Sequence, residues 1–390
     1  MKRRDFLQRS SLISLAPLLP TVISGAARAA ESKVDDRILV VIQLSGGNDE
    51  LNTLIPFADE NYVKHRKVLR IAENSILKLD DSVGLHPSMK AAADLFENGQ
   101  LSIVQGVGYP NPNRSHFESM DIWQTARMNS EDRTGHGWLG RAADGYGAEQ
   151  SSDPDSVFVG DSEIPVALRG RRANSISLNS EDELRLFGSF TRPFAASNGG
   201  DLDAFIRQTV DASYTAAKRL AESTPAGGDA DYPNSRPGKK LQLLSRMLKL
   251  DGGTRVFYVS QGGYDTHSDQ LNDHSRLLRE FSVSLSAFMK DMKESKLDDR
   301  VMVLAFSEFG RRVAENGSHG TDHETAGPVF IAGPSANNGL QGTYPSLTDL
   351  DEGDLKMTVD FRQVYASILQ TWLNVSPAPI LNGSFEPISI

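Results

Sequence analysis

Long runs of apolar residues, many of them β-branched, constrain this fold more than any other feature of the sequence. Such runs cover residues 37–44, 101–105, 255–259 and 301–306, and a shorter one covers 329–332. An uninterrupted apolar run of this kind is typical of a strand that is buried on both faces of a sheet. Helical periodicity separates the runs, at residues 87–96, 115–128, 238–250 and 271–292. The sequence therefore predicts an α/β fold with a mostly parallel central sheet and helices on both faces.

Weaker patterns complete the expected organisation. Residues 157–159 and 166–168 are expected to form short strands, and residues 201–222 and 360–373 to form helices. The polar segment 223–238, rich in proline and glycine, is expected to be an exposed loop. Because no repeat and no clear boundary is visible, residues 30–390 are expected to form one domain. Its sheet of about eight strands should place 37–44, 101–105, 255–259 and 301–306 side by side.

The first 29 residues have the pattern of an export signal. Residues 2–7, KRRDFL, are followed by a short apolar run at 11–19 and by Ala-Arg-Ala at 27–29. A basic start, an apolar centre and such an end are typical of a secretory signal peptide, and the paired arginines resemble the twin-arginine type. No later stretch reaches 18 apolar residues. We therefore expect export to the periplasm and no membrane span in the mature chain.

Composition excludes several classes of protein. The 390 residues include no cysteine, which excludes disulfide scaffolds, zinc sites with Cys ligands, iron–sulfur clusters and cysteine nucleophiles. The formal net charge is −10. A nucleic-acid binder needs a basic surface to replace the counterions of the phosphate backbone, so no nucleic-acid partner is expected.

Residues suited to chemistry gather at the ends of the expected strands. In open α/β sheets, ligands bind beyond the carboxyl ends of the strands. Five segments associated with strands combine glycine with charged, histidine or serine residues: they contain Asp49; Arg114, Ser115 and His116; Asp265 and His267; Glu308, Arg311 and Arg312; and Asp322 and His323. We expect these side chains to converge at one edge of the sheet.

Carboxylates and imidazoles together suit a divalent metal site. The candidate ligands are Asp49, Asp265, His267, Glu308, Asp322 and His323. They would form one cluster around Asp265, His267 and His323, and a second around Asp49, Ser115 and Glu308. One or two ions of Zn, Mn, Mg or Ca are expected, and two ions about 4 Å apart would clamp the attacking and leaving oxygens of a phosphoryl-type ester.

Other residues are candidates for the chemistry itself. Ser115 begins an expected helix, where the helix dipole favours an oxyanion, and it is the candidate nucleophile. Its neighbour His116 could instead be a ligand or a general acid–base, with Ser115 only capping the helix. Arg114, Arg311 or Arg312 would grip a small anionic substrate.

Each of these residues also has a plain structural explanation. Asp49 or Asp265 could cap a helix or close an Asx turn, and Ser115 could be an N-cap. Glu308 could pair with Arg311 on a helix face. His267 and His323 could be solvated surface residues. The histidines that are not close to an Asp in a glycine-flanked loop are expected at the surface: they are His65, His274 and His319.

An ordered set of motifs resembles the DUF1501 family, exported bacterial proteins whose function is poorly defined. The motifs are LSGGNDELN (44–52), GLHPSM (84–89), NRSHFESMDIWQT (113–125), GGYDTHSDQ (262–270), FSEFGRR (306–312) and GTDHE (320–324). Together with the twin-arginine start, the resemblance covers nearly the whole mature chain. The family is in turn similar to the alkaline phosphatase/sulfatase superfamily, which implies an alkaline-phosphatase-like fold.

The superfamily pattern implies roles for particular residues. It has an Asp after the first strand, a nucleophile at a helix start, an Asp/His pair, an acidic-His pair after a late strand and a final His. The matching residues here are Asp49, Ser115, the pair Asp265 and His267, Glu308 and His323.

The sequence departs from that pattern at several points. The spacing of Asp265 and His267 is shorter than usual, Phe309 stands in place of a histidine, and Glu324 stands where relatives have glycine. These departures favour a single-metal or altered site. The short motif that supplies the nucleophile of sulfatases is also missing, because the chain has no Cys and residues 115–119 do not match it.

Two functions therefore remain open. The first is an exported metal-dependent hydrolase of phosphate, phosphodiester or related esters. The second is a non-catalytic exported binding or assembly protein that retains the fold with a degenerate metal site. The metal content of protein purified without chelators separates them, because the second predicts substoichiometric metal.

Overall fold

A computed structural model describes residues 37–145, 153–179, 231–250, 252–334 and 339–390. The expected signal peptide, the expected helix 201–222 and the first part of the expected loop 223–238 lie outside these residues. No helix in the described part of the chain is both long enough and apolar enough to cross a membrane.

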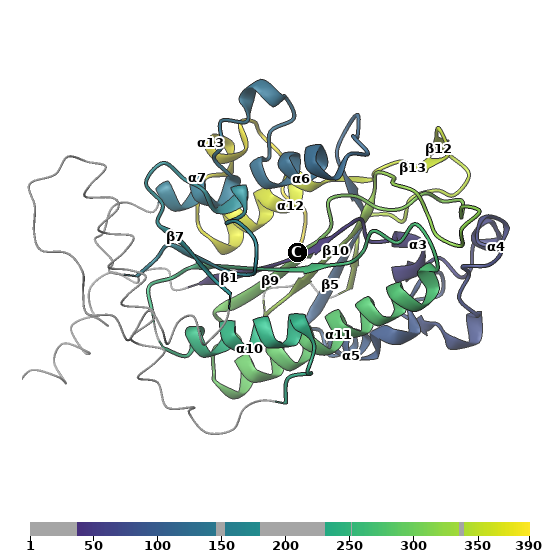
Figure 1. Cartoon of the computed structure of the whole chain (residues 1–390), viewed down its shortest axis with the longest axis horizontal. Coiled ribbons are helices and arrows are strands. Elements are labelled where there is room, and N and C mark those ends of the chain that lie inside the picture. Colours follow the sequence, from purple (N-terminus) through teal and green to yellow (C-terminus); the bar gives the residue numbers. More distant parts are fainter. Residues whose placement is uncertain (1–36, 146–152, 180–230, 251, 335–338) are drawn as a thin grey trace, which may run out of the picture. The chain divides into compact units, whose positions relative to one another are not determined.

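A central sheet of nine strands organises the described residues (Figure 1). Its order is β11 (Gly339–Gln341), β5 (Leu101–Gly108), β10 (Gly327–Ala332), β9 (Val301–Phe306), β1 (Ile38–Ser45), β8 (Val256–Gly262), β6 (Ser156–Val159) and β7 (Ser175–Leu178), with β14 (Val359–Asp360) paired to β5. Strand β10 is antiparallel to β5 and β9, and the other pairings in this sheet are parallel. The predicted α/β fold with a mostly parallel sheet is confirmed.

Strand β1 lies at the middle of the sheet because its side chains are apolar on both faces. It pairs with β8 on one side and with β9 on the other, both in parallel register. Val40 and Ile42 belong to one hydrophobic core, and Leu39 and Val41 to the core on the opposite face. The alternation of β1 side chains therefore joins the sheet to two helical layers.

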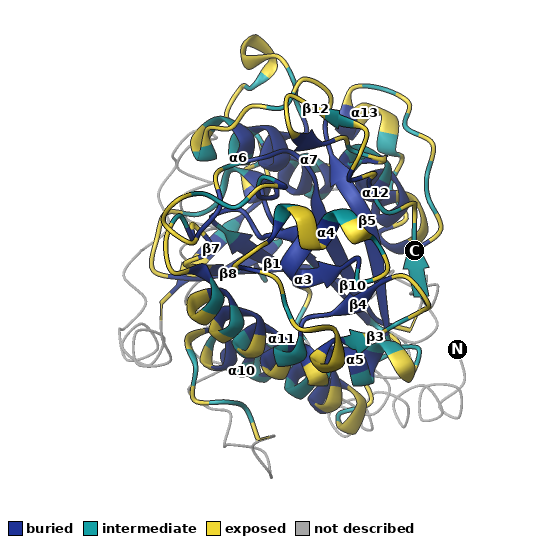
Figure 2. Cartoon of the chain, turned by 90° about the vertical axis from the view of Figure 1, so that its right-hand side faces the viewer, coloured by how far each residue is buried: buried dark blue, intermediate teal, exposed yellow. Residues whose placement is uncertain are grey.

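Helices cover the two faces as separate layers (Figures 1 and 2). One layer contains α5 (Lys90–Glu97), α10 (Arg236–Leu248) and α11 (Gln270–Glu294). The other contains α6 (His116–Thr125), α7 (Trp138–Asp144), α12 (Phe361–Ser367) and α13 (Pro377–Leu381). Figure 2 shows most strands of the central sheet as buried, whereas the helices of the first layer turn a buried side to the sheet and an exposed side to solvent. This is the amphipathic pattern from which they were predicted.

Short elements connect these layers. They are α3 (Glu50–Thr53), α4 (Glu60–His65), the small sheet of β2 (Leu54–Ile55), β4 (Gly84–Leu85) and β3 (Leu77–Lys78), the hairpin of β12 (Leu350–Asp351) and β13 (Asp354–Leu355), 3₁₀ turns at Glu73–Ser75, Pro87–Met89 and Ser130–Asp132, and a π-helical turn at Ile368–Trp372 after α12. The hairpin β12–β13 borders a polar pocket.

Three predicted elements differ in detail from the structure. Residues 166–168 form a 3₁₀ turn rather than a strand, because Pro165 precedes them and its carbonyl accepts a hydrogen bond from the Leu168 N–H. Helix α6 ends at Thr125, three residues early, since Ala126 adopts a left-handed conformation with φ 53°. Helix α10 begins inside the expected loop, where Ser235 caps it by accepting from the Gly238 N–H.

The direction of β10 decides which loops meet. Strands β9, β1 and β8 are adjacent as predicted. Strand β5 was expected beside them, but β10 lies between β5 and β9. Because β10 runs opposite to the others, its first residue, Gly327, lies at the edge where β1, β8 and β9 end. The segment 320–326 before β10 therefore joins the loops that follow the parallel strands.

Candidate metal centre

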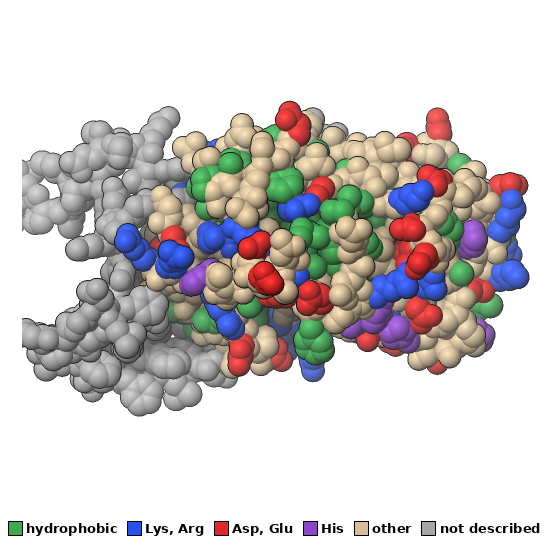
Figure 3. Space-filling view, turned by 90° about the horizontal axis from the view of Figure 1, so that it is seen from above, with side chains coloured by type: hydrophobic (Ala, Val, Ile, Leu, Met, Phe, Trp, Pro, Cys, Tyr) green, Lys and Arg blue, Asp and Glu red, His purple; other side chains and the backbone are tan. Residues whose placement is uncertain are grey.

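Four segments bring titratable side chains together at the carboxyl edge of the sheet. Asp265 and His267 follow β8, Glu308 follows β9, His116 begins α6 after β5, and His323 precedes β10. The glycines of the loop after β1 permit the close approach, since a Cβ atom at Gly46 would lie 2.4 Å from the Asp265 backbone nitrogen. In the space-filling view, histidine side chains gather beside acidic and basic side chains on one part of the surface (Figure 3).

The carboxylate of Asp265 is the centre of this group. Its Oδ1 lies 3.0 Å from His267 Nε2, 3.1 Å from His323 Nε2 and 3.3 Å from His116 Nε2. His267 Nε2 lies 2.9 Å from His323 Nε2. Ligand atoms of His116, Asp265 and His323 all lie within 4.8 Å of one another. We refer to His116, Asp265, His267 and His323 as the histidine cluster.

The other ring nitrogen of each histidine faces an acceptor. His116 Nδ1 lies 2.9 Å from Glu308 Oε1, and His267 Nδ1 lies 3.2 Å from Asp322 Oδ1. His323 Nδ1 lies 2.7 Å from the Arg114 carbonyl oxygen. A carboxylate or a carbonyl accepts only, so these contacts place the proton on Nδ1 of each neutral ring. The lone pair of each Nε2 is then directed toward Asp265 and the neighbouring rings.

This arrangement fits a metal ion. His116 Nε2 is buried and has no hydrogen-bond partner. Two lone pairs that face each other at 2.9 Å repel unless a proton or cation lies between them. Donor atoms on a tetrahedral zinc ion, with bonds of about 2.0–2.1 Å, lie about 3.3 Å apart, close to the contacts observed here. Histidine ligands whose second nitrogen is held by a carboxylate or carbonyl are the usual surroundings of such an ion.

The surrounding charges move the pKa values in different directions. Burial favours the neutral form of Asp265, but the hydrogen bond and the charge of Arg311 outweigh it and hold the Asp265 pKa well below its usual value. The hydrogen bond to Glu308 raises the pKa of His116. Burial lowers the pKa of His323, which keeps this ring neutral and able to donate its lone pair.

Arg311 is buried and faces away from solvent. Its guanidinium donates to the carbonyl oxygens of Gly46, Gly47, Tyr264 and Thr321, and to Asp265 Oδ1 at 2.6 Å. The residue is 0% exposed. The sequence predicts that Arg311 binds substrate. In the structure, Arg311 instead holds Asp265 in place and connects the loops after β1 and β8 with the segment before β10.

Glu308 and Phe309 line the cluster beside the rings of His116 and His323. Glu308 Oε1 accepts from the Gly46 N–H at 2.8 Å as well as facing His116, so Glu308 does not pair with Arg311. The Phe309 ring centroid lies 4.8 Å from the ring centroids of both His116 and His323. A Cβ atom at Gly47 would lie 2.6 Å from this ring. An apolar side chain thus lies beside the two rings, at the position where the resemblance implies a histidine.

Asp49 lies outside the cluster, in the interior. Arg66 binds both of its oxygens, with Nη1–Oδ2 at 2.5 Å and Nη2–Oδ1 at 2.9 Å. Asp49 also caps α3 through the Leu51 N–H and accepts from Gln270 Nε2. Both Asp49 and Arg66 are 0% exposed. The expected second metal cluster around Asp49, Ser115 and Glu308 is therefore not formed, because Arg66 already occupies the carboxylate.

Ser115 and Arg114 lie beside the cluster. Ser115 is the exposed N-cap residue of α6, but its side chain makes no capping hydrogen bond; its N–H donates to Asn113 Oδ1. The Arg114 side chain donates to Asp354 Oδ2 through Nε at 3.0 Å and Nη2 at 2.5 Å. Arg312 donates to Asp354 Oδ1 at 2.7 Å. Both arginines are thus engaged with Asp354, and substrate would have to compete with it.

His274 and Arg66 were not foreseen from the sequence. Predicted at the surface, His274 is buried, and its Nε2 lies 3.0 Å from Asn48 Oδ1. The position of His274 within the apolar face of α11, three residues before Leu277, was the signal that could have placed it inside. No pattern near Arg66 distinguishes it from an exposed arginine, since its partner Asp49 is 17 residues away.

A family model described as "Protein of unknown function (DUF1501)" matches residues 36–376. The chain belongs to the DUF1501 family. The histidine cluster lies entirely within the matched part of this DUF1501 chain. No curated protein matches it.

Three solved structures illustrate what the DUF1501 chain is similar to. The C-terminal periplasmic domain of EcEptC from Escherichia coli is 9% identical, with a TM-score of 0.42 over 86% of this chain and 82% of that one. The PsFucS1 sulfatase from Pseudoalteromonas sp. is 9% identical, with a TM-score of 0.38 over 88% and 69%. A protein in the alkaline phosphatase superfamily from Vibrio parahaemolyticus is 13% identical, with a TM-score of 0.34 over 76% and 60%. At these identities and TM-scores, the likeness does not carry the activity of any of these proteins over to the DUF1501 chain.

Proposed function

We propose that this DUF1501 protein is an exported, metal-dependent hydrolase of phosphate esters, phosphodiesters or related esters. The observation that carries the proposal is the histidine cluster, in which the Nε2 atoms of three histidines lie within 3.3 Å of Asp265 Oδ1. Of these atoms, the buried His116 Nε2 lacks any hydrogen-bond partner. The basic start and Ala-Arg-Ala end of residues 1–29 support export by the twin-arginine route.

The residues that would hold the metal are His116, His267, His323 and Asp265. A set rich in imidazole suits Zn²⁺ or Mn²⁺ better than Mg²⁺ or Ca²⁺, which prefer oxygen ligands. A divalent ion bound there supplies Lewis-acid polarisation of an ester oxygen and lowers the pKa of a bound hydroxyl. Because Phe309 fills the neighbouring space and Arg66 occupies Asp49, we propose a single-metal site.

The chain supplies a nucleophile and its support. The Ser115 hydroxyl, exposed at the first turn of α6 and adjacent to His116, would attack the central atom of the ester. The bond from that atom to the alcohol oxygen breaks, and the alcohol leaves with a proton. Water then cleaves the Ser115 ester and restores the hydroxyl. Glu308 holds the His116 ring in place, and Arg114 would bind a non-bridging oxygen by exchange with Asp354.

The test combines metal content with turnover. Protein purified without chelators is expected to contain about one metal ion per chain and to hydrolyse an aryl phosphate, phosphodiester or sulfate when supplied with Zn²⁺ or Mn²⁺. His323→Ala should lose metal and activity together. Ser115→Ala should keep the metal and lose activity; undiminished turnover in this variant would transfer the attack to water. Absence of bound metal in the native protein would contradict the proposal.

A second candidate is a non-catalytic exported binding or assembly protein. Two observations favour it: Asp49 is sealed in an ion pair with Arg66, and Phe309 replaces a histidine beside the cluster. This function predicts substoichiometric metal and no turnover of any ester with any of the metals.

A further inference from the structure

A polar pocket of about 440 Å³ lies beside the histidine cluster. The Arg114 side chain lines it, while the Arg114 carbonyl accepts the hydrogen bond of His323 Nδ1. Thr325, two residues after His323, lines it as well. The loop 111–114 forms one wall and the hairpin β12–β13 the other, with Asp351, Glu352 and Asp354. The pocket and the cluster are therefore adjoining, linked through Arg114 and the segment 323–325, and a group held in the pocket would lie next to the proposed reaction centre.

The charges in the walls are partly neutralised. Asp354 is 1% exposed, and Arg114 and Arg312 bind its two oxygens. Arg114 Nη2 also lies 3.8 Å from Glu352 Oε2, and Arg312 donates to the Glu352 carbonyl. The two guanidinium groups thus neutralise Asp354 and lie near Glu352, whereas Asp351 adds a further negative charge to the lining. With two guanidinium groups against three carboxylates, the walls keep a small negative charge, which does not select a polyanion.

The walls also contain almost no apolar side chains. Pro112 is the only apolar side chain of the lining, whose other members carry amide, hydroxyl, guanidinium or carboxylate groups. Pockets for acyl or aryl groups are lined mainly by hydrophobic side chains. Fixed acceptors and donors without such surface suit a ligand with many hydroxyl groups, each of which can both donate and accept.

We infer that this pocket receives an uncharged, polyhydroxylated alcohol portion of the ester, such as a sugar or a polyol. The inference rests on the proposed function, because it names the substrate class of the same site. The phosphate-type group would face the histidine cluster, and the hydroxyl groups would bind Asp351, Glu352 and the amides of Asn111 and Asn113.

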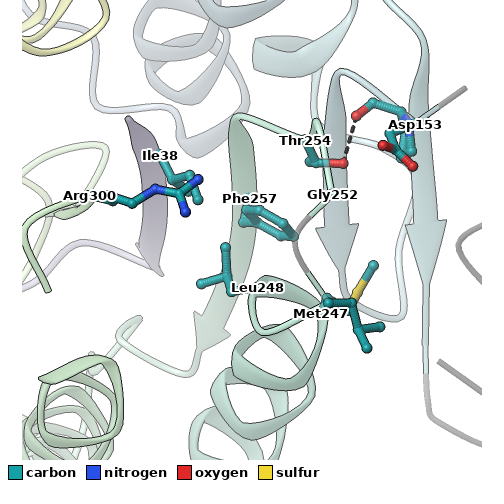
Figure 4. A pocket seen from close by; sticks show the side chains of 10 residues that line it. Ile38, Asp153, Met247, Leu248, Gly252, Thr254, Phe257 and Arg300 are labelled. Atoms are coloured by element: carbon teal, nitrogen blue, oxygen red, sulfur yellow. Dashed lines mark hydrogen bonds between the residues drawn. The ribbon is translucent and has the colours of Figure 1, made fainter. Parts of the chain in front are cut away.

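A second hollow among the described residues does not fit this role. It lies at the opposite edge of the sheet, near the start of β1 and β8, and it is lined by Ile38, Leu248, Phe257 and Arg300 among others (Figure 4). It admits about 40 Å³, enough for a few water molecules but not for a sugar.

The experiment uses two monoesters with six carbons and the same phosphate. Sorbitol 6-phosphate carries hydroxyl groups along its chain, and hexyl phosphate carries none. We expect kcat/KM to be at least about 10-fold higher for sorbitol 6-phosphate, since a site built to bind hydroxyl groups rejects the analogue that lacks them. The double variant Asp351→Ala/Glu352→Ala should abolish this preference. The control Asp298→Ala/Asp299→Ala removes the same charge beyond α11, before β9, and should keep it.

Binding of sorbitol itself separates the inference from the proposed function. Saturation-transfer NMR should detect sorbitol but not 1-hexanol on the metal-free protein, and the signal should be lost in Asp351→Ala/Glu352→Ala. Sorbitol binding without turnover of any ester would support the pocket and contradict the proposed hydrolase. Turnover with equal kcat/KM for the two esters would overturn the inference. Neither turnover nor sorbitol binding would overturn both.

Discussion

Two Asp–Arg pairs follow neighbouring strands of the same sheet, yet they belong to different environments. Asp49 follows β1 and pairs with Arg66; Asp265 follows β8 and pairs with Arg311. The Asp49 side chain is 0% exposed, and its two oxygens are occupied by Arg66 and by hydrogen bonds from Leu51 and Gln270. The Asp265 side chain is 49% exposed, and its Oδ1 faces three imidazoles as well as Arg311.

The difference teaches what makes a carboxylate available for chemistry. A buried ion pair is weak evidence of stability by itself, but its charges cannot be left unpaired once the chain has enclosed them. Asp49 is therefore committed to the fold. Arg311 uses most of its donors on backbone carbonyls and leaves Asp265 with one face toward the cluster. Only the second pair combines a fixed carboxylate with open coordination space.

The strongest test of this comparison is the same substitution at both aspartates. Asp49→Asn leaves the Arg66 charge buried without its partner, and we expect it to lower the free energy of unfolding by about 3–5 kcal/mol. Asp265→Asn should cost less stability, because the side chain is half exposed and the Asn oxygen still accepts from Arg311. It should instead weaken metal binding at least about 100-fold. Urea unfolding and metal titration measure the two effects.

The outcome that breaks the comparison is a shared phenotype. If Asp49→Asn lost metal while remaining folded, Asp49 would belong to the functional site after all. If Asp265→Asn unfolded the protein as strongly as Asp49→Asn, the pair with Arg311 would be structural in the same sense as the pair with Arg66.

The pH dependence of the free energy of unfolding tests the buried region around Asp49, where the neighbouring Glu50 is also enclosed. Burial, opposed by the hydrogen bond from the Gly106 N–H and reinforced by Asp49, raises the pKa of Glu50 from 4.5 to about 8. Because the folded pKa lies above the unfolded one, the stabilising proton is fully effective below about pH 4.5 and is lost as pH rises through about 8. We expect stability to fall by at most about 1.4 kcal/mol per pH unit in this window from Glu50 alone.

Glu50→Gln isolates this contribution. The variant cannot ionise, so the difference in unfolding free energy between it and the native protein should grow in favour of the variant from pH 5 to pH 8. Burial lowers the pKa of His86 to about 4 and of His274 to about 3, which works in the opposite direction, but both histidines are present in both proteins. A difference that stays constant across the window would mean that Glu50 is ionised in the folded protein.

The sequence allowed the fold class and much of the cluster to be predicted. Apolar runs revealed the strands, and the rule that ligands bind at carboxyl ends pointed to Asp265, His267 and His323. The direction of β10 could not be read from its residues, because Gly327–Ala332 is as apolar as a parallel strand. Yet only the antiparallel direction brings His323 to the edge where β8 ends.

For a related reason, the sequence could not predict which of the two aspartates is buried and which faces the histidine cluster. Asp49 and Asp265 look alike in sequence, each following a strand and a pair of glycines. Their difference depends on which arginine reaches them, from 17 and 46 positions away. Long-range pairing of this kind leaves no local pattern in the sequence. The ion pair of Arg66 with Asp49 therefore could not be predicted, and Arg311 was predicted to bind substrate.

The smallest expected effect compares those two arginines directly. Arg311→Lys and Arg66→Lys each keep a buried charge and each lose hydrogen bonds to backbone carbonyls. Only Arg311 contacts a residue of the histidine cluster, so only Arg311→Lys should weaken metal binding, by about 10–100-fold, as expected when a partner of a metal ligand is removed. Arg66→Lys should bind metal within about threefold of the native protein. Titration with Co²⁺ gives both the affinity and a visible spectrum that reports ligand geometry. If only Arg311→Lys changes the spectrum, Arg311 is the residue that positions Asp265. If both variants lose metal affinity in proportion to their lost stability, both arginines affect the metal only through the fold.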